Sequence, residues 1–371
     1  MTTQPENSDR HGKGSGGGSS PHDRIQRPLV LIKQEPRNAE ATLDALREAR
    51  TPLENFYMRN HFAMPRLSVN DWQLQVTDAV RRPRTLSLDD VRRLPSRTIT
   101  ATLECAGNDR GGLAPLPKGE SWTSGAVSTG EWSGVALRDV LDQAGLDADA
   151  IEILAIGADR GKPQGSDEEL SFARSLPRGK ALDPDTLLAY ELNGAPLPHE
   201  HGGPVRLLVP DWYGMASVKW LLQISGLRQP FGGYFQRENY VLELPGQAGY
   251  EPLREMRVKS LITNPAAGEV LALGTHRVSG IAWSGHGAIR QVEVSTEGEG
   301  PWQPAHLLGK PTPHAWRQWE FPWEVGQPGR HALRARATDL PGNRQPDLPQ
   351  WNRLGYANNA IQVVMVEIAN D

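Results

Sequence analysis

Glycine and proline dominate the local character of this chain, and they limit the folds open to it. The sequence holds 38 glycines and 30 prolines in 371 residues, well above the share of about 12% in ordinary soluble proteins. Both residues interrupt helices, glycine through its backbone entropy and proline through its missing N–H. This composition disfavours a helix bundle and predicts strands joined by many turns, with few and short helices.

Short helical and strand-like segments alternate in the first two thirds of the chain. Apolar residues at helical spacing predict helices over Ala39–Ala49, Ser87–Leu94 and Ala136–Ala144. Segments rich in β-branched and apolar residues predict strands over Trp72–Val76, Thr98–Leu103, Ile151–Ile156 and Val205–Val209. This alternation indicates a mixed α and β domain.

After about Pro252 the pattern changes to strands at short spacing. The strand-like segments are Val278–Trp283, Ile289–Ser295, Trp316–Phe321, His331–Ala337 and Ala360–Ile368. They predict an antiparallel sandwich of about 120 residues. Because the chain exceeds what one hydrophobic core usually serves, we expect an α+β protein with two domains, residues 27–252 and 253–371. Residues 1–26, rich in Gly, Ser and charge, are expected to form a disordered tail.

The charges of the chain nearly balance. There are 40 Lys and Arg against 44 Asp and Glu, a net charge of −4, which leaves no global field for nucleic acid or an acidic membrane surface. The apolar stretches fall far short of the roughly 20 residues that span a bilayer, and residues 1–25 show neither a Sec nor a twin-arginine signal. We expect a soluble, cytoplasmic protein whose partners are small molecules or proteins.

Cys105 is the one cysteine of the sequence. A single thiol excludes an internal disulfide, a Cys-rich zinc site and a protein-ligated iron–sulfur cluster. Cys105 follows the strand-like Thr98–Leu103 and precedes a run of turn formers beside Arg110, a neighbour that favours ionisation of the thiol. Two other interpretations stay open here: a small buried hydrophobe, and a nucleophile paired with one of the ten histidines.

A second group of polar and cationic residues spans His199–Leu222. It places His201, Arg206 and Lys219 around a strand-like stretch flanked by glycines. Arg can bind phosphate through two parallel hydrogen bonds, and exposed backbone N–H groups add donors, so the segment suits an anionic, phosphate-bearing cofactor. A solvated loop with incidental charges fits equally well. His199 and His201 would point the same way on a strand, but no third metal ligand is evident nearby.

Two of these stretches, Glu104–Asn108 and His201–Leu222, resemble the signatures of the sulfite oxidase family. Further matches in family order are Tyr57–His61, Lys118–Ala126, Leu188–Gly194 with Pro198, Gln236–Tyr240 and Trp351–Gly355. The resemblance covers roughly Asn55 to Ile368. It implies a sulfite-oxidase-like molybdopterin-binding domain of mixed α/β structure, followed by an all-β, immunoglobulin-like dimerisation domain, and hence a homodimer.

The resemblance also implies a molybdenum cofactor, with Cys105 as the thiolate ligand of the metal beside a pterin dithiolene and oxo groups. The implied cofactor-binding residues are Tyr57, Met58, Arg59, Asn60, His61, Asp159, His201, Arg206, Ser217, Val218 and Lys219. The implied catalytic residues are Arg59, Arg110, Trp122, Tyr240 and Arg353. In this family the sulfur lone pair of sulfite attacks a molybdenum oxo group, and binding of the dianion requires several fixed cations.

Two positions depart from the family pattern. Asp109 stands where familiar members place a second arginine after the asparagine, and we expect this acid to weaken the positive field of the substrate pocket. Arg353 falls one position earlier than in the usual Trp-Asn-Leu-Arg-Gly pattern, so a third substrate cation is missing if it points away. A pocket that loses a charge contact loses discrimination. Another sulfur compound or oxyanion is therefore the alternative substrate.

The sequence contains no Cys-x-x-Cys-His motif and no segment assignable to a haem or flavin domain. We therefore expect electrons to leave to a separate acceptor such as a cytochrome, which disfavours a nitrate-reductase-like role. Two functions of other classes remain as alternatives. One is a thiol enzyme that uses Cys105 as nucleophile without molybdenum, and the other is a non-catalytic binding module, against which the presence of Cys105, Arg206 and Lys219 argues.

Overall fold

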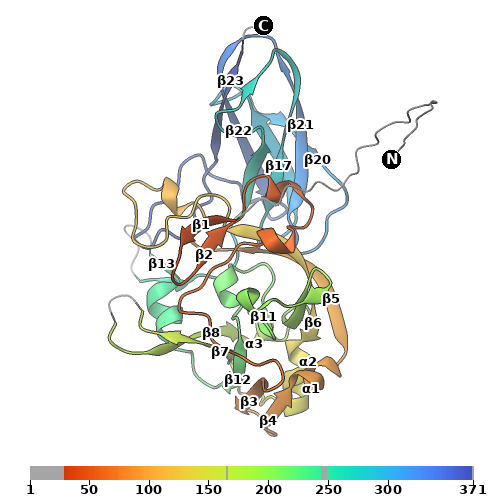
Figure 1. Cartoon of the computed structure of the whole chain (residues 1–371), viewed down its shortest axis with the longest axis vertical. Helices are drawn as coiled ribbons and strands as arrows, with labels where there is room; N and C mark the ends of the chain where they lie inside the picture. Colours follow the sequence, from red (N-terminus) through yellow and green to blue (C-terminus); the bar gives the residue numbers. More distant parts are fainter. Residues whose placement is uncertain (1–28, 164–165, 244–248, 370–371) are drawn as a thin grey trace, which may run out of the picture.

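The computed structural model describes residues 29–163, 166–243 and 249–369, so the predicted tail over residues 1–26 lies outside the described residues. Figure 1 shows a broad mixed body built from the first two thirds of the chain, with an elongated all-β domain above it. Within the described residues, no helix is both long and apolar enough to cross a membrane.

Two five-stranded sheets form the framework of the mixed body. The first has the order β10-β9-β6-β5, with β11 paired to β9, and consists of β5 (Ser96–Glu104), β6 (Val127–Ala136), β9 (Leu187–Leu192), β10 (Ala195–Pro196) and β11 (Arg206–Leu208). The second has the order β4-β3-β12-β7-β8 and consists of β3 (Gln73–Asp78), β4 (Arg84–Ser87), β7 (Glu152–Gly161), β8 (Leu170–Pro177) and β12 (Leu221–Leu227). Only the β12–β3 pairing in these two sheets is parallel. The strands predicted around residues 72, 98, 151 and 205 are confirmed as β3, β5, β7 and β11.

Short helices and strand pairs complete the mixed body. The α-helices are α1 (Leu88–Arg92), α2 (Leu137–Ala144) and α3 (Arg178–Ala181), and the two-stranded pairs are β1 (Val30–Lys33) with β2 (Asn38–Glu40) and β13 (Val241–Leu242) with β14 (Glu251–Pro252). Single 3₁₀ turns are η1 (Ala45–Arg47), η2 (Leu53–Asn55), η3 (Arg110–Gly112), η4 (His199–His201) and η5 (Gly214–Ala216), and η6 (Phe235–Asn239) is a π-helix. The expectation of few and short helices is confirmed.

Two of the three helix predictions are confirmed. At the start of α1, Ser87 and Asp90 form a capping box, each side chain bonding the backbone N–H of the other. Helix α2 ends at Gly145, whose left-handed φ of 71° is a common helix terminator.

The helix predicted over Ala39–Ala49 is wrong. Ala39 pairs with Met58 in an extended bridge, and the N–H of Ala41 donates to the carbonyl of Gly125 at 2.9 Å. These tertiary hydrogen bonds override the local helical pattern, and only the single turn η1 forms.

The C-terminal domain consists of two sheets. A four-stranded sheet of order β15-β17-β21-β20 contains β15 (Lys259–Asn264), β17 (Gly274–Trp283), β20 (His306–Leu307) and β21 (Arg317–Val325). A five-stranded sheet of order β16-β23-β22-β18-β19 contains β16 (Val270–Leu271), β18 (Ile289–Ser295), β19 (Gln303–Pro304), β22 (Gly329–Asp339) and β23 (Val363–Ile368). Val278 and Trp319 of the first sheet share a buried apolar cluster with Val292 and Leu333 of the second, which confirms the predicted sandwich.

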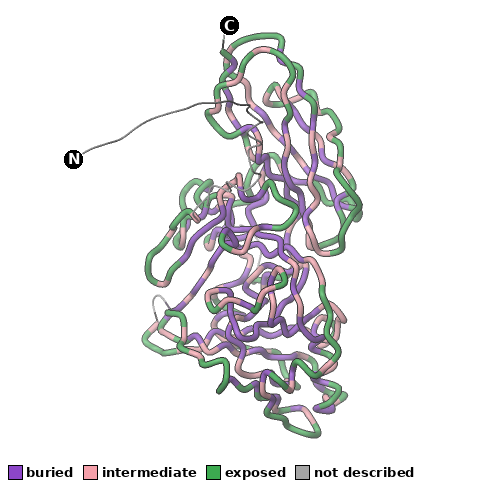
Figure 2. Tube along the Cα trace, turned by 45° about the vertical axis from the view of Figure 1, so that its right-hand side comes forward, coloured by how far each residue is buried: buried purple, intermediate pink, exposed green. Residues whose placement is uncertain are grey.

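The two domains share a buried apolar junction. Ile281 and Trp283 of β17 belong to the same cluster as Tyr213 and Met215 of the mixed body. Figure 2 shows buried chain running from the interior of the mixed body into the base of the sandwich. The end of β5, where Cys105 follows, lies close to this junction because Trp283 contacts Glu104.

Candidate functional site

Cys105 directly follows the last residue of β5 and begins a tight loop, as the sequence predicted. Its N–H donates to the carbonyl of Ala126 at 2.9 Å, and its carbonyl accepts from the N–H of Asn108 at 2.9 Å. The residue is 6% exposed. Burial raises the pKa of the thiol, and Arg59 and Arg110 offset this effect only in part, so the expected ionisation is not achieved by the neighbouring arginines alone.

An inner cavity extends from Cys105 into the mixed body. Nine of the eleven residues that the resemblance assigned to the cofactor line it: Tyr57, Met58, Arg59, His61, Asp159, His201, Arg206, Ser217 and Lys219. These residues come from five separate segments of the chain. The fold therefore gathers around one cavity residues that the sequence spreads from Tyr57 to Lys219.

Arg206 and Lys219, two of the cationic side chains of the cavity, are held by backbone carbonyls. Arg206 donates to the carbonyl of His201 at 2.9 Å and to that of Ser217 at 2.8 Å. Lys219 donates to the carbonyl of Glu200 at 3.1 Å and to the side chain of Asn60. These neutral acceptors fix the positions of both side chains. Burial lowers the pKa of Arg206 to about 10 and the pKa of Lys219 well below its usual value, and an anion bound beside them would oppose this effect.

Asn60 and Val218, the other two assigned residues, do not line the cavity. Asn60 is 1% exposed and acts through Lys219, whose ammonium it contacts. Val218 is fully buried, and its carbonyl accepts from the N–H of Leu207 at 2.8 Å. Both side chains therefore support the wall rather than form its surface.

Two further groups suit an uncharged, hydrogen-bonding heterocycle. Asp159 is 4% exposed, and its Oδ1 has no hydrogen-bond partner among the described residues. Burial raises the pKa of Asp159 to about 6, against the opposing effect of Lys219. Burial, together with Lys219 and Arg206, lowers the pKa of His201 to about 3, so this imidazole is neutral. A soft thiol, fixed cations and an unpartnered buried acceptor fit a phosphorylated pterin that carries a metal.

A wide outer cleft meets the inner cavity at Cys105. Arg59, His61 and Cys105 line both spaces, whereas Arg110, Trp122 and other residues line the outer cleft alone. Cys105 thus lies at the boundary between the inner cavity and the outer cleft.

Arg110 occupies a slot made by glycines. Its Nη1 donates to the carbonyl of Glu120 at 2.9 Å, and its Nε donates to the carbonyl of Leu354 at 3.1 Å. A Cβ atom on Gly107 would stand 2.7 Å from Nη2, and one on Gly355 would stand 2.8 Å from Cγ. The side chain is therefore held by backbone packing on several sides.

Trp122 lies in the wall of the outer cleft and is fully buried. Its Nε1–H has no acceptor among the described residues. A buried indole N–H normally finds a partner, so its position in the same cleft as two arginines suits an oxyanion.

Tyr240 does not line either space directly. Its hydroxyl and the Nε2 atom of His61 lie 2.5 Å apart, and its ring stacks on Tyr356 with centroids 5.0 Å apart. Burial raises the pKa of the phenol to about 12, although Arg59 opposes the effect. Tyr240 therefore stays protonated and reaches the cleft through His61.

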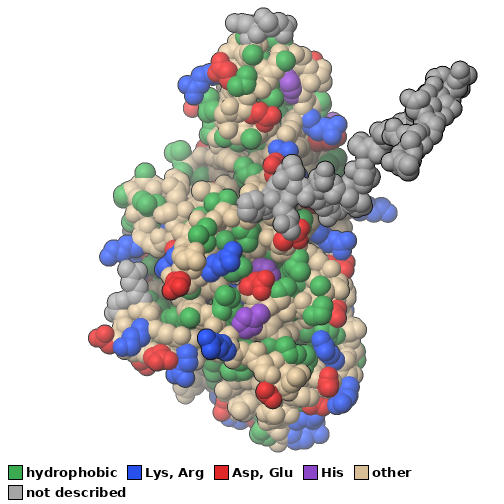
Figure 3. Space-filling view, viewed as in Figure 1, with side chains coloured by type: hydrophobic (Ala, Val, Ile, Leu, Met, Phe, Trp, Pro, Cys, Tyr) green, Lys and Arg blue, Asp and Glu red, His purple; other side chains and the backbone are tan. Residues whose placement is uncertain are grey.

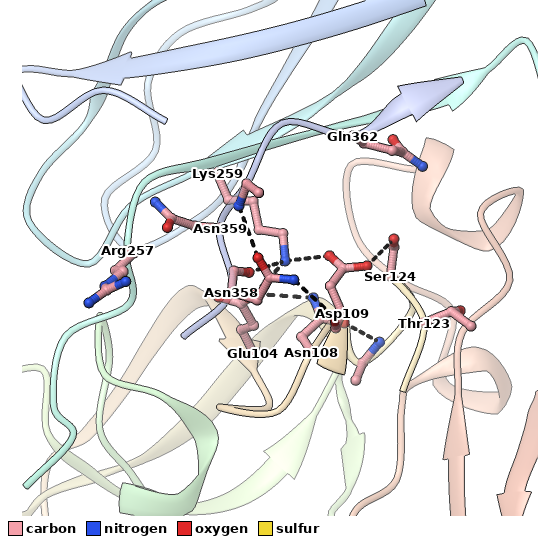
Figure 4. A network of polar contacts seen from close by, with 12 residues as sticks. Glu104, Asn108, Asp109, Thr123, Ser124, Arg257, Lys259, Asn358, Asn359 and Gln362 are labelled. Atoms are coloured by element: carbon pink, nitrogen blue, oxygen red, sulfur yellow. Dashed lines mark hydrogen bonds and ion pairs between the residues drawn. The ribbon is translucent and has the colours of Figure 1, made fainter. Parts of the chain in front are cut away.

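Asp109 was expected to weaken the positive field of the substrate pocket, but its carboxylate does not line the outer cleft. Its Oδ2 lies 2.5 Å from Nζ of Lys259, and its Oδ1 accepts from the hydroxyl of Ser124 at 2.5 Å. Figure 4 shows Asp109 extending toward Lys259 of the C-terminal domain. The residue does not line the outer cleft, because a buried cation from the second domain binds its carboxylate.

Arg353 lines the outer cleft but not the inner cavity. Its guanidinium forms a two-point ion pair with Glu243, with Nε–Oε2 at 2.7 Å and Nη2–Oε1 at 2.6 Å. The third cation expected from the resemblance is therefore present in the cleft, but its charge is already matched.

Some residues around the site had no signal in the sequence. Tyr356 lies under the guanidinium of Arg110, 4.9 Å from the ring centre. Arg174 is 1% exposed and donates to the carbonyls of Phe235 and Leu253, which hold the segment before and after Tyr240. Their partners are distant along the chain, and a local pattern carries no information about them.

The idea of a metal site at His199 and His201 gains no support. The Nε2 atom of His199 bonds the carbonyl of Pro65 at 2.8 Å. The described part of the chain holds no group of three or more His, Cys, Asp or Glu side chains arranged for a metal ion. On the face drawn in Figure 3, charges of both signs are interspersed.

Residues 61–235 match the family described as "Oxidoreductase molybdopterin binding domain", and residues 251–369 match "Mo-co oxidoreductase dimerisation domain". Mitochondrial sulfite oxidase from Homo sapiens is 36% identical over 94% of this chain and 67% of its own length. NADH nitrate reductase from Ulva prolifera is 34% identical over 90% of this chain and 42% of its own length.

A solved structure extends the likeness to three dimensions. The sulfane dehydrogenase SoxCD from Paracoccus pantotrophus superposes with a TM-score of 0.81 at 29% identity, covering 96% of this chain and 93% of that chain. Together with the cavity at Cys105, these likenesses leave the alternatives of a thiol enzyme and a binding module without support. The chain belongs to the sulfite oxidase family of molybdopterin-dependent oxidoreductases.

Proposed function

We propose that this protein oxidises sulfite to sulfate and passes the electrons to a separate acceptor such as a cytochrome. The reaction adds one oxygen atom, derived from water, to the sulfur and releases two protons and two electrons. The observation that carries the proposal is the place of Cys105, at the boundary between the inner cavity and a cleft lined by Arg59, Arg110 and Trp122.

The cleft residues account for binding of a small oxyanion. Arg59 and Arg110 supply two permanent positive charges, and the unpartnered N–H of Trp122 supplies a neutral donor. Arg110 is held by the carbonyls of Glu120 and Leu354 before any substrate arrives. Such preorganisation lowers the entropic cost of binding.

The cavity residues would hold the cofactor. Arg206 and Lys219 would bind its phosphate, Asp159 and His201 would bond its heterocycle, and Cys105 would ligate the molybdenum. When bound, the cofactor supplies the oxygen atom and takes up the two electrons. The Tyr240 hydroxyl stays protonated and hydrogen-bonds His61, which lines the same cavity as Cys105.

The C-terminal domain supports a homodimer, because residues 251–369 match a dimerisation domain.

Oxidation of a sulfane sulfur is a second candidate. It is favoured by the ion pair of Arg353 with Glu243, which reduces the positive charge offered to a small dianion. The likeness to sulfane dehydrogenase SoxCD points the same way.

Steady-state kinetics with purified protein separate the two candidates. Ferricyanide reduction is measured with sulfite and with thiosulfate, alongside molybdenum content by elemental analysis. Rapid turnover of sulfite with stoichiometric metal is the expected result. Stoichiometric metal with turnover of thiosulfate alone would favour the second candidate, and a metal-free protein from a cofactor-competent host would contradict both.

A further inference from the structure

The buried ammonium of Lys259 contacts three acceptors. Its Nζ atom lies 2.5 Å from Oδ2 of Asp109 and 3.5 Å from Oε1 of Glu104, and it donates to the carbonyl of Asn358 at 2.9 Å. The side chain is 3% exposed. Three acceptors match the three N–H donors of a lysine, and Figure 4 shows them surrounding one nitrogen.

The two carboxylates that Lys259 binds are each next to a site residue in the sequence. Glu104 directly precedes Cys105, and Asp109 directly precedes Arg110. One ammonium from β15 of the second domain therefore fixes the residue before the metal ligand and the residue before a substrate-cleft cation.

Other groups of the second domain contact the same loop. Trp283 Nε1 donates to Oε2 of Glu104 at 2.9 Å, and the side-chain amide of Asn358 donates to the carbonyl of Asp109 at 2.9 Å. Within the loop, Asn108 donates to Oε1 of Glu104 at 3.1 Å. The loop of Cys105 is thus held by a polar network whose side chains line neither the inner cavity nor the outer cleft, with Lys259 as its single cation among the described residues.

We propose that Lys259 is a positioning residue: by binding Glu104 and Asp109 together, it sets the spacing between Cys105 and Arg110 in the active site. The sign of the charge at residue 109 is central to this role. An arginine there, as in the family pattern, would repel Lys259, whereas Asp109 attracts it. The carboxylate of Asp109 is therefore part of an inter-domain ion pair and does not lie in the substrate cleft.

The energetics of buried ion pairs indicate that Lys259 fixes the geometry of the loop rather than adding much to the stability of the fold. Buried ion pairs contribute little net stability when compared with apolar packing, but removal of one partner leaves uncompensated charge. Loss of Lys259 would leave the buried carboxylate of Glu104 and the partly exposed carboxylate of Asp109 without their shared cation, and the loop would have to move to hydrate Glu104. Such a movement displaces Cys105 and Arg110 relative to each other.

Three variants test the proposal in the full-length, cofactor-loaded protein. Lys259→Met removes the bridging cation, and Asp109→Asn removes one link while keeping the ion pair of Lys259 with Glu104. His314→Gln is the matched control, because His314 bonds Asp211 at 2.9 Å and Asp185 at 3.1 Å and so joins the two domains away from this loop.

Each variant is assayed for molybdenum content, melting temperature, KM and kcat for sulfite, and the electron paramagnetic resonance spectrum of the metal after reduction with dithionite. We expect Lys259→Met to change the spectrum and to raise KM about tenfold, the usual effect of losing a group that orients a metal ligand. Asp109→Asn should raise KM by a smaller factor with kcat unchanged. His314→Gln should lower the melting temperature with the wild-type spectrum and KM.

A Lys259→Met protein with the wild-type spectrum and KM would overturn the proposal, however much its melting temperature fell. If that variant does not fold, Asp109→Asn decides: a raised KM supports the proposal and an unchanged KM contradicts it. The inference rests on the proposed function only for its kinetic readout. Should the wild type not oxidise sulfite, the dithionite-reduced spectra still decide it, because they report the surroundings of the metal without substrate.

Discussion

Arg353 and Glu243 form a two-point ion pair across the outer cleft, with N–O distances of 2.7 and 2.6 Å. The Arg353 side chain is 60% exposed, so water and salt screen the pair and its net contribution to stability is small. The pair changes the electric field of the cleft, because the carboxylate of Glu243 compensates the positive charge of Arg353 that would otherwise face an incoming dianion.

Glu243→Gln should therefore lower the KM for sulfite. Freed of its carboxylate, Arg353 adds one positive charge to the cleft, and we expect a decrease of about two- to threefold at low ionic strength that shrinks in high salt. Asp149→Asn is the control, because Asp149 pairs with Arg228 at 2.8 Å on an exposed surface outside the cleft. Equal KM values in the Glu243 variant and the wild type at low salt would mean that Arg353 has no influence on substrate.

Cys105→Ser should abolish turnover while leaving the fold intact. Serine fills the space of the thiol, but its hydroxyl is a poor ligand for molybdenum, and we expect kcat to fall by more than about a hundredfold. Circular dichroism and gel filtration check the fold and the dimer, and ferricyanide reduction checks the activity. Full activity in this variant would refute the assignment of Cys105 as the metal ligand.

Gly355→Ala should weaken sulfite binding. Gly355 has a φ of 64°, and an added Cβ would lie 2.8 Å from Cγ of Arg110, so the arginine must leave its slot. We expect a KM increase of about tenfold, with a stability loss of about 1 kcal/mol from the left-handed backbone.

Gly309→Ala is the matched control for this test. Gly309 has the same φ of 64°, and no heavy atom lies within 4 Å of its added Cβ. The control should lose similar stability and keep its KM. If both variants keep the wild-type KM, the position of Arg110 does not govern binding.

His314 should make the stability depend on pH. Burial alone would lower the pKa of its imidazole, but hydrogen bonds and charge interactions with Asp211 and Asp185 outweigh it and raise the pKa above the usual value of 6.5. Asp185 also pairs with Arg97 at 2.5 Å, which reduces the charge that it offers His314. Because the folded pKa is the higher one, the stabilisation is complete below pH 6.5 and is lost as the pH rises through the folded value.

Thermal unfolding of the wild type and His314→Gln at pH 6 and pH 9 measures this effect. We expect the wild type to be more stable than His314→Gln at pH 6 by about 1 kcal/mol, the usual net contribution of one hydrogen bond in a protein, and the difference to vanish at pH 9. A difference that is the same at both values would show that His314 contributes through packing alone.

Local sequence patterns predicted much of the fold. The family resemblance named nine residues that line the inner cavity. Abundant glycine and proline predicted a strand-rich chain, and the spacing of apolar residues over Ser87–Leu94 predicted α1. The helix predicted over Ala39–Ala49 failed, because Ala39 and Ala41 pair with Met58 and Gly125. Long-range hydrogen bonds of this kind leave no periodic trace.

The sequence by itself determined the identity of the chemistry: a lone cysteine at a strand end, and the order of motifs that marks the family. Such information is local, since Cys105 and the residues of its motif are consecutive in the chain. Only the tertiary structure decided what the departures mean. Asp109 and Arg353 each take their role from a partner, Lys259 and Glu243, and a charge acts through the distance to other charges, which chain folding alone sets.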